Sequence, residues 1–186
     1  MGNEPPTFCH YCGGGLTPVD PPTVHRCNAC GEHVFYNPSP CSRVAVVNGE
    51  SILLVKVDLP ERNMWGTPGG MVEAGEDPNE AGARELAEET TLTVDPNDLV
   101  LFDVRTFAKF ETIHKTYLVY AVDVADVHGT PRADDEVAAA RFWTPDELKA
   151  ARDELLTSWP AEYRDLRWWI DGAQAALGRN RDRDRS

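Results

Sequence analysis

The spacing of three glutamates is the feature of this sequence that most directly indicates chemistry. Glu85, Glu88 and Glu89 stand at positions i, i+3 and i+4, so a helix would carry their carboxylates on one face. Like charges at this spacing destabilise a helix by about 0.2–0.5 kcal/mol per pair. Carboxylate oxygens are the ligands that hard divalent cations prefer. We therefore interpret the three side chains as a site for Mg²⁺ or Mn²⁺, with a solvated acidic helix face as the alternative.

The residues around the glutamates carry the signals of a helix that follows a glycine loop. Asp77 suits the N-cap, Pro78 suits the first helical position, and Glu80 completes a start that is typical of a capping box. Residues 65–70, with the sequence WGTPGG, predict a tightly bent loop. The sequence thus predicts a glycine loop followed by a helix with acidic residues in its middle.

This segment resembles the Nudix box, the signature of the Nudix hydrolase superfamily. Besides the three glutamates, the matching positions are Gly70, Glu76, Arg84, Leu86 and Leu92. Thr91 stands where the family has glycine, which would suit a left-handed helix end that a β-branched residue disfavours. The departure concerns the helix end and removes no ligand. The resemblance implies an α/β fold, an α/β/α sandwich with a mixed sheet, and hydrolysis of a pyrophosphate bond.

The resemblance also implies roles in metal binding. Glu85, Glu88 and Glu89 match the metal-binding glutamates, and the backbone carbonyl of Gly70 is a candidate further ligand. Arg84 matches the arginine that orients the glutamates, with Glu76 as its salt-bridge partner. Direct contact between Arg84 and phosphate is the alternative.

Further candidates concern the base and the substrate. The general base is either Glu85 or a carboxylate outside the box, for which Glu136 is the best candidate and an exposed loop acid is the alternative reading. Gly69, Gly70 and Trp65 are expected near the substrate, although the Trp65 ring suits packing equally well. Two arginines are candidates for phosphate contact, with ordinary surface charge as the alternative: Arg43 and Arg105.

Four cysteines near the N-terminus predict a metal-binding ribbon. Cys9 and Cys12 form one Cys-x-x-Cys pair, and Cys27 and Cys30 form a second after fourteen intervening residues. A glycine follows each pair and permits a tight turn. Four thiolates so spaced are typical of a closed, structural Zn²⁺ site, and a pair of disulfides is the alternative.

Composition limits the classes of function. The chain has 186 residues and a formal net charge of −13, from 31 acidic and 18 basic residues. This balance disfavours duplex DNA as a partner, because DNA affinity comes mostly from basic contacts to phosphates. No apolar run is long enough for a membrane span and no signal peptide is evident, so we expect a cytoplasmic protein without a membrane partner. The acidity suits either a salt-adapted organism or an ordinary acidic enzyme.

The remaining sequence predicts a mixed sheet with few helices. Strands are expected at 42–47 and 51–57 around an Asn48-Gly49 turn, and at 99–107, 112–124 and 136–143. Helices are expected from the Thr144 capping box to about 155 and from about 160 to 177. The predicted domains are a zinc ribbon at 1–38, a Nudix domain at 39–158, a C-terminal helix at 159–178 and a disordered tail at 179–186.

The substrate class follows from the resemblance as a small nucleoside diphosphate derivative. A zinc ribbon before a Nudix domain resembles the layout of the NADH pyrophosphatase branch, but the Ser-Gln-Pro-Trp-Pro-Phe-Pro-like signature of that branch is absent. The proline that marks ADP-ribose hydrolases is absent too, since none occurs between Pro96 and Pro131. ADP-ribose, NADH, nucleotide sugars and nucleoside triphosphates stay open. Other classes also stay open: a nucleotide sensor that does not cleave, an RNA-binding zinc ribbon, and a ribbon that forms a homodimer.

Overall fold

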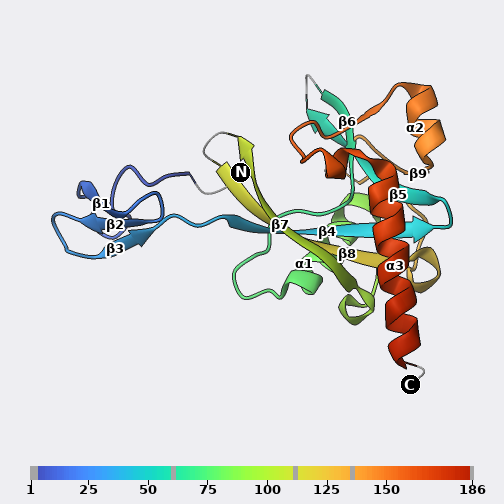
Figure 1. Cartoon of the computed structure of the whole chain (residues 1–186), viewed down its shortest axis with the longest axis horizontal. Helices are drawn as coiled ribbons and strands as arrows, with labels where there is room; N and C mark the ends of the chain where they lie inside the picture. Colours follow the sequence, from blue (N-terminus) through green and yellow to red (C-terminus); the bar gives the residue numbers. More distant parts are fainter. Residues whose placement is uncertain (1–3, 60–61, 111–112, 135–136, 185–186) are drawn as a thin grey trace. The chain divides into compact units, whose positions relative to one another are not determined.

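The chain folds as two compact units in the computed structural model. The structure describes residues 4–59, 62–110, 113–134 and 137–184, whose helices and strands are labelled in Figure 1. One unit comprises Met1–Ser39 and Thr106–Thr116, and the other comprises Pro40–Arg105 and Tyr117–Ser186.

The N-terminal residues form a small antiparallel sheet of three strands in the order β1-β2-β3. These strands are β1 (Leu16–Asp20), β2 (Val24–Cys27) and β3 (His33–Phe35). The core of this sheet is small, with Cys9, Cys27 and Val34 buried and Leu16 packed against them. A core of this size supplies little stability by itself, so a segment of this kind depends on additional links such as a metal site.

The main sheet has seven strands: β4 (Ser39–Asn48), β5 (Ser51–Leu59), β6 (Arg62–Gly66), β7 (Val100–Phe110), β8 (Ile113–Asp123), β9 (Ala139–Trp143) and β10 (Glu154–Leu155). Their order is β10-β6-β5-β4-β8-β7, and β9 pairs with β5 off this path. Strand β10 runs parallel to β6, whereas β5 is antiparallel to β4, β6 and β9. The sheet is therefore mixed, which confirms the predicted fold class.

Strand β5 shares one of its edges between two strands. Ile52 pairs with β4 and β9, while Val55 pairs with β6 and β9. Because a strand residue has only two edges, β9 occupies one edge, and β4 and then β6 occupy the other. Strand β4 thus leaves β5 where β6 joins it.

The loop that follows β6 pairs with the freed edge of β4. The Val44 amide donates to the Pro68 carbonyl at 2.9 Å, and the Ser42 amide donates to the Gly70 carbonyl at 2.9 Å. The predicted glycine loop is therefore attached to the sheet by backbone hydrogen bonds on both sides of Gly69.

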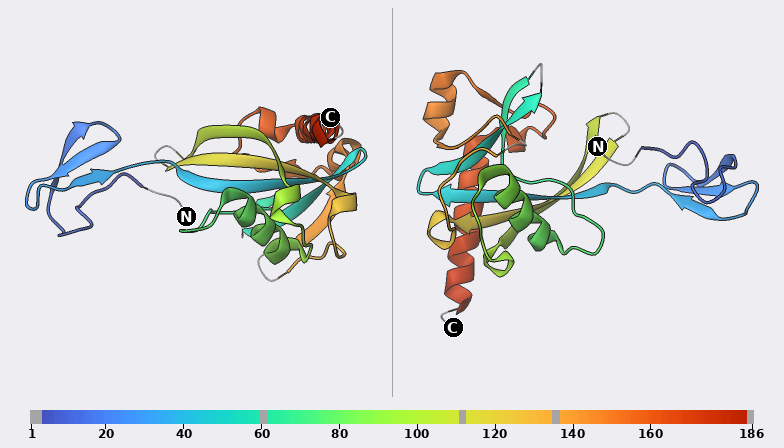
Figure 2. Two further views of the ribbon diagram at one scale, coloured as in Figure 1. Left: turned by 90° about the horizontal axis from the view of Figure 1, so that it is seen from below. Right: turned by 180° about the vertical axis from the view of Figure 1, so that it is seen from behind.

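Helices cover both faces of the main sheet. Figure 2 shows α1 (Pro78–Thr90, green) on one face and α3 (Leu166–Asp184, red) on the other. Helix α2 (Pro145–Ala151) and three short 3₁₀ helices, η1 (Pro96–Asp98), η2 (Val124–Asp126) and η3 (Glu162–Arg164), complete the fold. Leu86 packs into a core whose other buried members are Val44, Val46, Leu53, Leu92, Leu99, Tyr120 and Val122.

Local signals explain where α1 begins and how closely it approaches β4. The Asp77 amide donates to the Glu80 carboxylate at 2.9 Å, and Pro78 opens the helix, as predicted. The Ser42 hydroxyl donates to the Pro78 carbonyl at 2.7 Å. A Cβ on Gly82 would lie 2.9 Å from that hydroxyl oxygen, so only glycine allows this approach.

The C-terminal elements differ from the sequence prediction. The helix that begins at the Thr144 capping box ends at Ala151 and not near 155, because Arg152 adopts the left-handed conformation with φ 57° and β10 follows. The helix expected from about 160 begins at Leu166. It continues to Asp184, where a disordered tail was expected from 179, and this last part includes an Arg181–Asp123 ion pair at 2.9 Å.

Candidate active site

Arg84 connects the acidic side chains of the predicted metal site. Its Nε and Nη2 donate to the two oxygens of Glu76 at 2.8 and 3.1 Å, which is the bidentate geometry. Its Nη1 donates to Glu85 and to Glu88, both at 2.9 Å, and its Nη2 also donates to the Met71 carbonyl at 3.1 Å. Hydrogen bonds from the Arg84 guanidinium hold the pKa of Glu76 below its ordinary value. The guanidinium therefore neutralises and orients these carboxylates.

Glu85 is the least exposed of the three carboxylates that Arg84 binds. Its side chain is 14% exposed, against 46% for Glu88. Burial raises the pKa of Glu85, and Arg84 opposes that change. A Cβ on Gly70 would lie 2.3 Å from a Glu85 oxygen, so any other residue at this position would displace the Glu85 carboxylate.

Glu89 joins the helix to the glycine loop. The Gly69 amide donates to the Glu89 carboxylate at 2.8 Å. Gly69 has φ 140°, and a Cβ there would lie 2.1 Å from the Ser42 carbonyl oxygen, so no other residue fits. The structure thus brings Gly69, Gly70 and the predicted metal-binding glutamates together.

The three glutamates are not gathered around a single point. Within the described part of the chain, the four cysteines are the group of three or more His, Cys, Asp or Glu whose ligand atoms all lie within 4.8 Å of one another. Arg84 holds Glu85 and Glu88, and the Gly69 amide holds Glu89. Their oxygens nonetheless have the chemistry of a hard divalent cation site.

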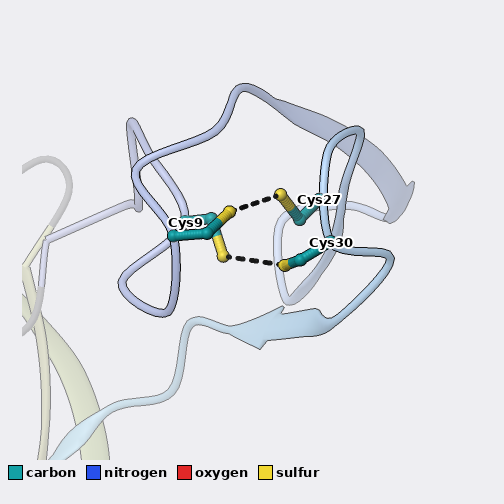
Figure 3. A group of neighbouring side chains, drawn as sticks. Cys9, Cys27 and Cys30 are labelled. Carbon is teal, nitrogen blue, oxygen red and sulfur yellow. Dashed lines mark hydrogen bonds between the residues drawn. The ribbon is translucent and has the colours of Figure 1, made fainter.

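The four cysteine sulfurs have the spacing of a tetrahedral metal site. Figure 3 shows Cys9, Cys27 and Cys30 directed towards one another. The sulfurs of Cys9 and Cys30 are 3.7 Å apart, and those of Cys12 and Cys27 are 3.5 Å apart. Four sulfurs at about 2.3 Å from Zn²⁺ would be about 3.8 Å from one another.

The cysteines are free thiols, which excludes the disulfide alternative for this structure. Gly13 and Gly31 have φ 75° and 79°, as the two predicted tight turns require. The backbone amides of Cys30 and Ala29 lower the pKa of Cys27 to about 6, whereas burial and hydrogen bonds with the other cysteines raise the pKa of Cys30 to about 12. A bound cation would favour the thiolate at both positions. The ribbon can therefore hold a metal ion.

Comparison with known proteins decides the family. A family model described as the NUDIX domain matches residues 39–167. The chain belongs to the Nudix hydrolase family. This Nudix match includes the glycine loop, all of α1 and the main sheet strands that position them.

Relatives and solved structures agree with the Nudix assignment. The NAD-capped RNA hydrolase NudC of Pectobacterium atrosepticum is 32% identical over 87 residues, which are 47% of this chain and 34% of that protein. NudC of Photobacterium profundum is 34% identical over 88 residues, 47% of this chain and 33% of that protein. The aligned segment thus spans about a third of the length of these curated relatives.

Two solved Nudix structures resemble the chain. The MutT NUDIX hydrolase from Burkholderia pseudomallei has a TM-score of 0.58 at 25% identity and covers 74% of this chain and 98% of its own. A NUDIX hydrolase from Nitrosomonas europaea has a TM-score of 0.62 at 22% identity and covers 76% of this chain and 79% of its own. At 22% identity, the likeness to the Nitrosomonas europaea structure shows the fold alone.

Trp65 packs inside the Nudix fold in this structure. The residue is 4% exposed, its ring centroid lies 5.0 Å from that of Trp143, and its indole N–H donates to Asp153 at 3.0 Å. These contacts favour the packing alternative over stacking on a substrate base. Glu136, the predicted general base outside the box, lies outside the described residues.

The sequence analysis did not identify the backbone of β4 as part of the Nudix site. Ser42 contributes its amide to Gly70 and its carbonyl oxygen to the tight contact with Gly69. A sequence signal for this contact is the pair of glycines, which indicates that another backbone approaches closely. It does not indicate which strand approaches.

No helix in the described residues has the length and apolarity needed to cross a membrane.

Proposed function

We propose that this protein hydrolyses a pyrophosphate bond in a nucleoside diphosphate linked to another group, with a divalent cation as cofactor. The observation that carries the proposal is the contact between helix α1 and the glycine loop. Arg84 orients Glu85 and Glu88 on α1, and the Gly69 amide of the loop donates to Glu89. Membership of the Nudix hydrolase family supports the same reaction class.

Glu85, Glu88 and Glu89 are the proposed ligands of Mg²⁺ or Mn²⁺. The Gly70 carbonyl accepts one hydrogen bond from Ser42 and keeps a second lone pair for a ligand role. When bound, such a cation would neutralise the diphosphate charge and lower the pKa of water, which the acidic side chains alone cannot do. We also propose that Cys9, Cys12, Cys27 and Cys30 hold a structural Zn²⁺, which the sulfur distances support.

The side chains have separate proposed tasks. Arg84 acts as the orienting residue, because its donors are used by four acceptor groups of the protein. Glu85 is the proposed base within the described residues, since burial raises the pKa of its half-buried carboxylate and so favours proton acceptance. Glu136 is the competing candidate for the base.

The first substrate to test contains NAD. The relatives reported above are named NAD-capped RNA hydrolases, and the ribbon-plus-Nudix layout resembles the NADH pyrophosphatase branch. We therefore place NADH and an NAD-capped RNA ahead of ADP-ribose, nucleotide sugars and nucleoside triphosphates.

A nucleotide panel with defined variants tests the proposal. Each compound is incubated with and without Mg²⁺ or Mn²⁺, and nucleotide products are quantified by chromatography. Glu89→Gln should abolish turnover, whereas Glu50→Gln, at a side chain that is 78% exposed, is the matched control and should not. Cation-dependent cleavage in the control but not in Glu89→Gln supports a hydrolase. Nucleotide binding without any cleavage supports the sensing alternative.

Contact between the ribbon and RNA is a second candidate function. Three aromatic side chains of the ribbon are strongly exposed: Phe8 at 65%, Tyr11 at 64% and Phe35 at 59%. Exposed rings of this kind stack on unpaired bases without sequence preference. Electrophoretic shift of a single-stranded RNA by the wild type, lost in Phe8→Ala/Tyr11→Ala, would support this function, and an unshifted RNA would exclude it.

A further inference from the structure

Arg43 on β4 has an enclosed guanidinium. Its Cζ lies 5.4 Å from the ring centroid of Tyr117 and 5.9 Å from that of Trp159. Its Nη1 donates to the Thr67 carbonyl at 2.7 Å. Two aromatic faces thus replace much of the water around a planar cation, and the Thr67 carbonyl fixes its orientation.

The guanidinium has no carboxylate partner among the described residues. Arg84, Arg105 and Arg181 each form ion pairs within 4.0 Å, but Arg43 forms none there. The Arg43 Nε is also buried without a hydrogen-bond partner. Enclosing a charged group with no carboxylate within 4.0 Å and with an unused donor is costly, so a chain that keeps such a group has a use for it.

Two residues that contact this cation each carry a buried polar atom without a partner. The atoms are Oγ1 of Thr67, whose own carbonyl binds Arg43, and Nε1 of Trp159, whose ring faces Arg43. A Cβ on Gly66 would lie 3.2 Å from the Trp159 ring, so the ring packs on the residue that precedes Thr67. All three atoms can donate a hydrogen bond, and the group carries one positive charge. That combination matches an anion with several acceptor oxygens.

The position of Arg43 connects this group to the proposed active site. Its neighbours Ser42 and Val44 hold the glycine loop, and a Cβ on Gly69 would lie 2.9 Å from the Arg43 Cα. Gly69 is the residue whose amide binds Glu89. The charge of Arg43 also acts on Glu89 and Glu85. An anion bound at Arg43 would therefore lie beside the same glycine loop that holds Glu89.

We propose that Arg43, Thr67 and Trp159 form a phosphate subsite that binds one phosphate of the diphosphate substrate. This inference rests on the proposed function, because it assigns the substrate a second anchoring point beside the glutamates. It makes Arg43 a substrate-binding residue on β4, outside the box.

Calorimetric titration with inorganic pyrophosphate, with and without Mg²⁺, tests the subsite independently of turnover. Arg43→Gln should raise the pyrophosphate Kd on the order of 10–100-fold, the effect of losing a charged hydrogen-bond donor. Thr67→Val removes one donor at nearly constant volume, and Trp159→Phe removes one donor and leaves a smaller aromatic ring, so each should raise Kd about 2–10-fold. Arg141→Gln is the matched control, because Arg141 also stacks on an aromatic ring, Trp143 at 3.9 Å, but has a carboxylate partner, Glu147 at 3.6 Å.

Thermal unfolding of the same variants separates binding from a structural role. Without ligand, Thr67→Val should have an unchanged or higher Tm, since it removes a buried hydroxyl that has no partner. Weaker pyrophosphate binding together with a Tm that is not lower supports the subsite. If Arg43→Gln does not fold, the Thr67 and Trp159 variants decide.

The results can separate the subsite from the proposed function. Pyrophosphate binding that is weakened in all three variants but not in Arg141→Gln supports the subsite, even if no compound of the panel is cleaved. Wild-type Kd values in all three variants overturn the subsite. They leave the proposed function intact if cleavage still depends on Glu89.

Discussion

Replacing Thr91 by glycine should stabilise the protein. Thr91 ends α1 in the left-handed conformation, with φ 59° and ψ 9°, and its amide donates to the Ala87 carbonyl at 2.9 Å. For a residue with a Cβ this conformation costs about 1–2 kcal/mol, whereas glycine adopts it freely. The Thr91 hydroxyl also donates to the Thr130 carbonyl at 3.2 Å on the surface, and losing that bond costs about 0.5 kcal/mol.

The difference predicts that Thr91→Gly raises the free energy of unfolding by about 0.5–1.5 kcal/mol. In a protein of this size each kcal/mol corresponds to a Tm increase of about 2–4 °C. Urea unfolding followed by circular dichroism, at fixed protein and metal concentrations, measures the change.

Thr91→Ala is the control for the hydroxyl. Alanine keeps the Cβ and loses only the bond to Thr130, so it should be slightly less stable than the wild type. The difference between the glycine and alanine variants therefore measures the backbone effect. A glycine variant that is no more stable than the alanine variant would refute the reasoning that the left-handed helix end is strained.

Three further predictions concern the box, the ribbon and the core. Glu76→Gln should lower the free energy of unfolding at pH 7 by about 1–3 kcal/mol, because it removes the bidentate partner of Arg84. The folded-state pKa of Glu76 lies below 4.5, so this contribution is present above pH 4.5 and disappears as the pH falls through the folded-state pKa. Urea unfolding at about pH 3 should therefore show a smaller difference in stability between the wild type and Glu76→Gln. Metal removal by a strong chelator should expose Cys9 and Cys27, now buried, to a thiol reagent, and equal labelling with and without chelator would contradict metal binding there. Leu86→Ala, at a side chain with 0% exposure, should cost about 2–5 kcal/mol in the same urea assay.

Local signals made the box helix predictable. Asp77, Pro78 and Glu80 act within one turn, so the sequence predicts the start of α1 without knowledge of the tertiary fold. The same holds for the capping box at Thr144, whose hydroxyl accepts from the Glu147 amide at 3.2 Å. The contacts of Arg84 could be predicted for a similar reason, because its acidic partners lie close along the chain and match a known motif.

Helix ends and short strands were less predictable because tertiary contacts decide them. Arg152 ends α2 in a left-handed conformation that sequence patterns assign to glycine, so nothing in the sequence indicates that end. Strand β10 has two residues and exists because it pairs with β6, which lies far away in the sequence. The position of Arg43 opposite Gly69 likewise depends on strand pairing and not on spacing.

The division of the β5 edge between β4 and β6 has a consequence for motion. Because β4 leaves β5 early, its amides at Ser42 and Val44 bond to the glycine loop, and the loop behaves as a short extra strand of the sheet. Amide hydrogens of this kind exchange with solvent only when the surrounding sheet opens. The Ser42 and Val44 amides, which donate to the loop carbonyls, should therefore exchange slowly, on the timescale of the core strands, and the movements that admit a substrate must come from other segments.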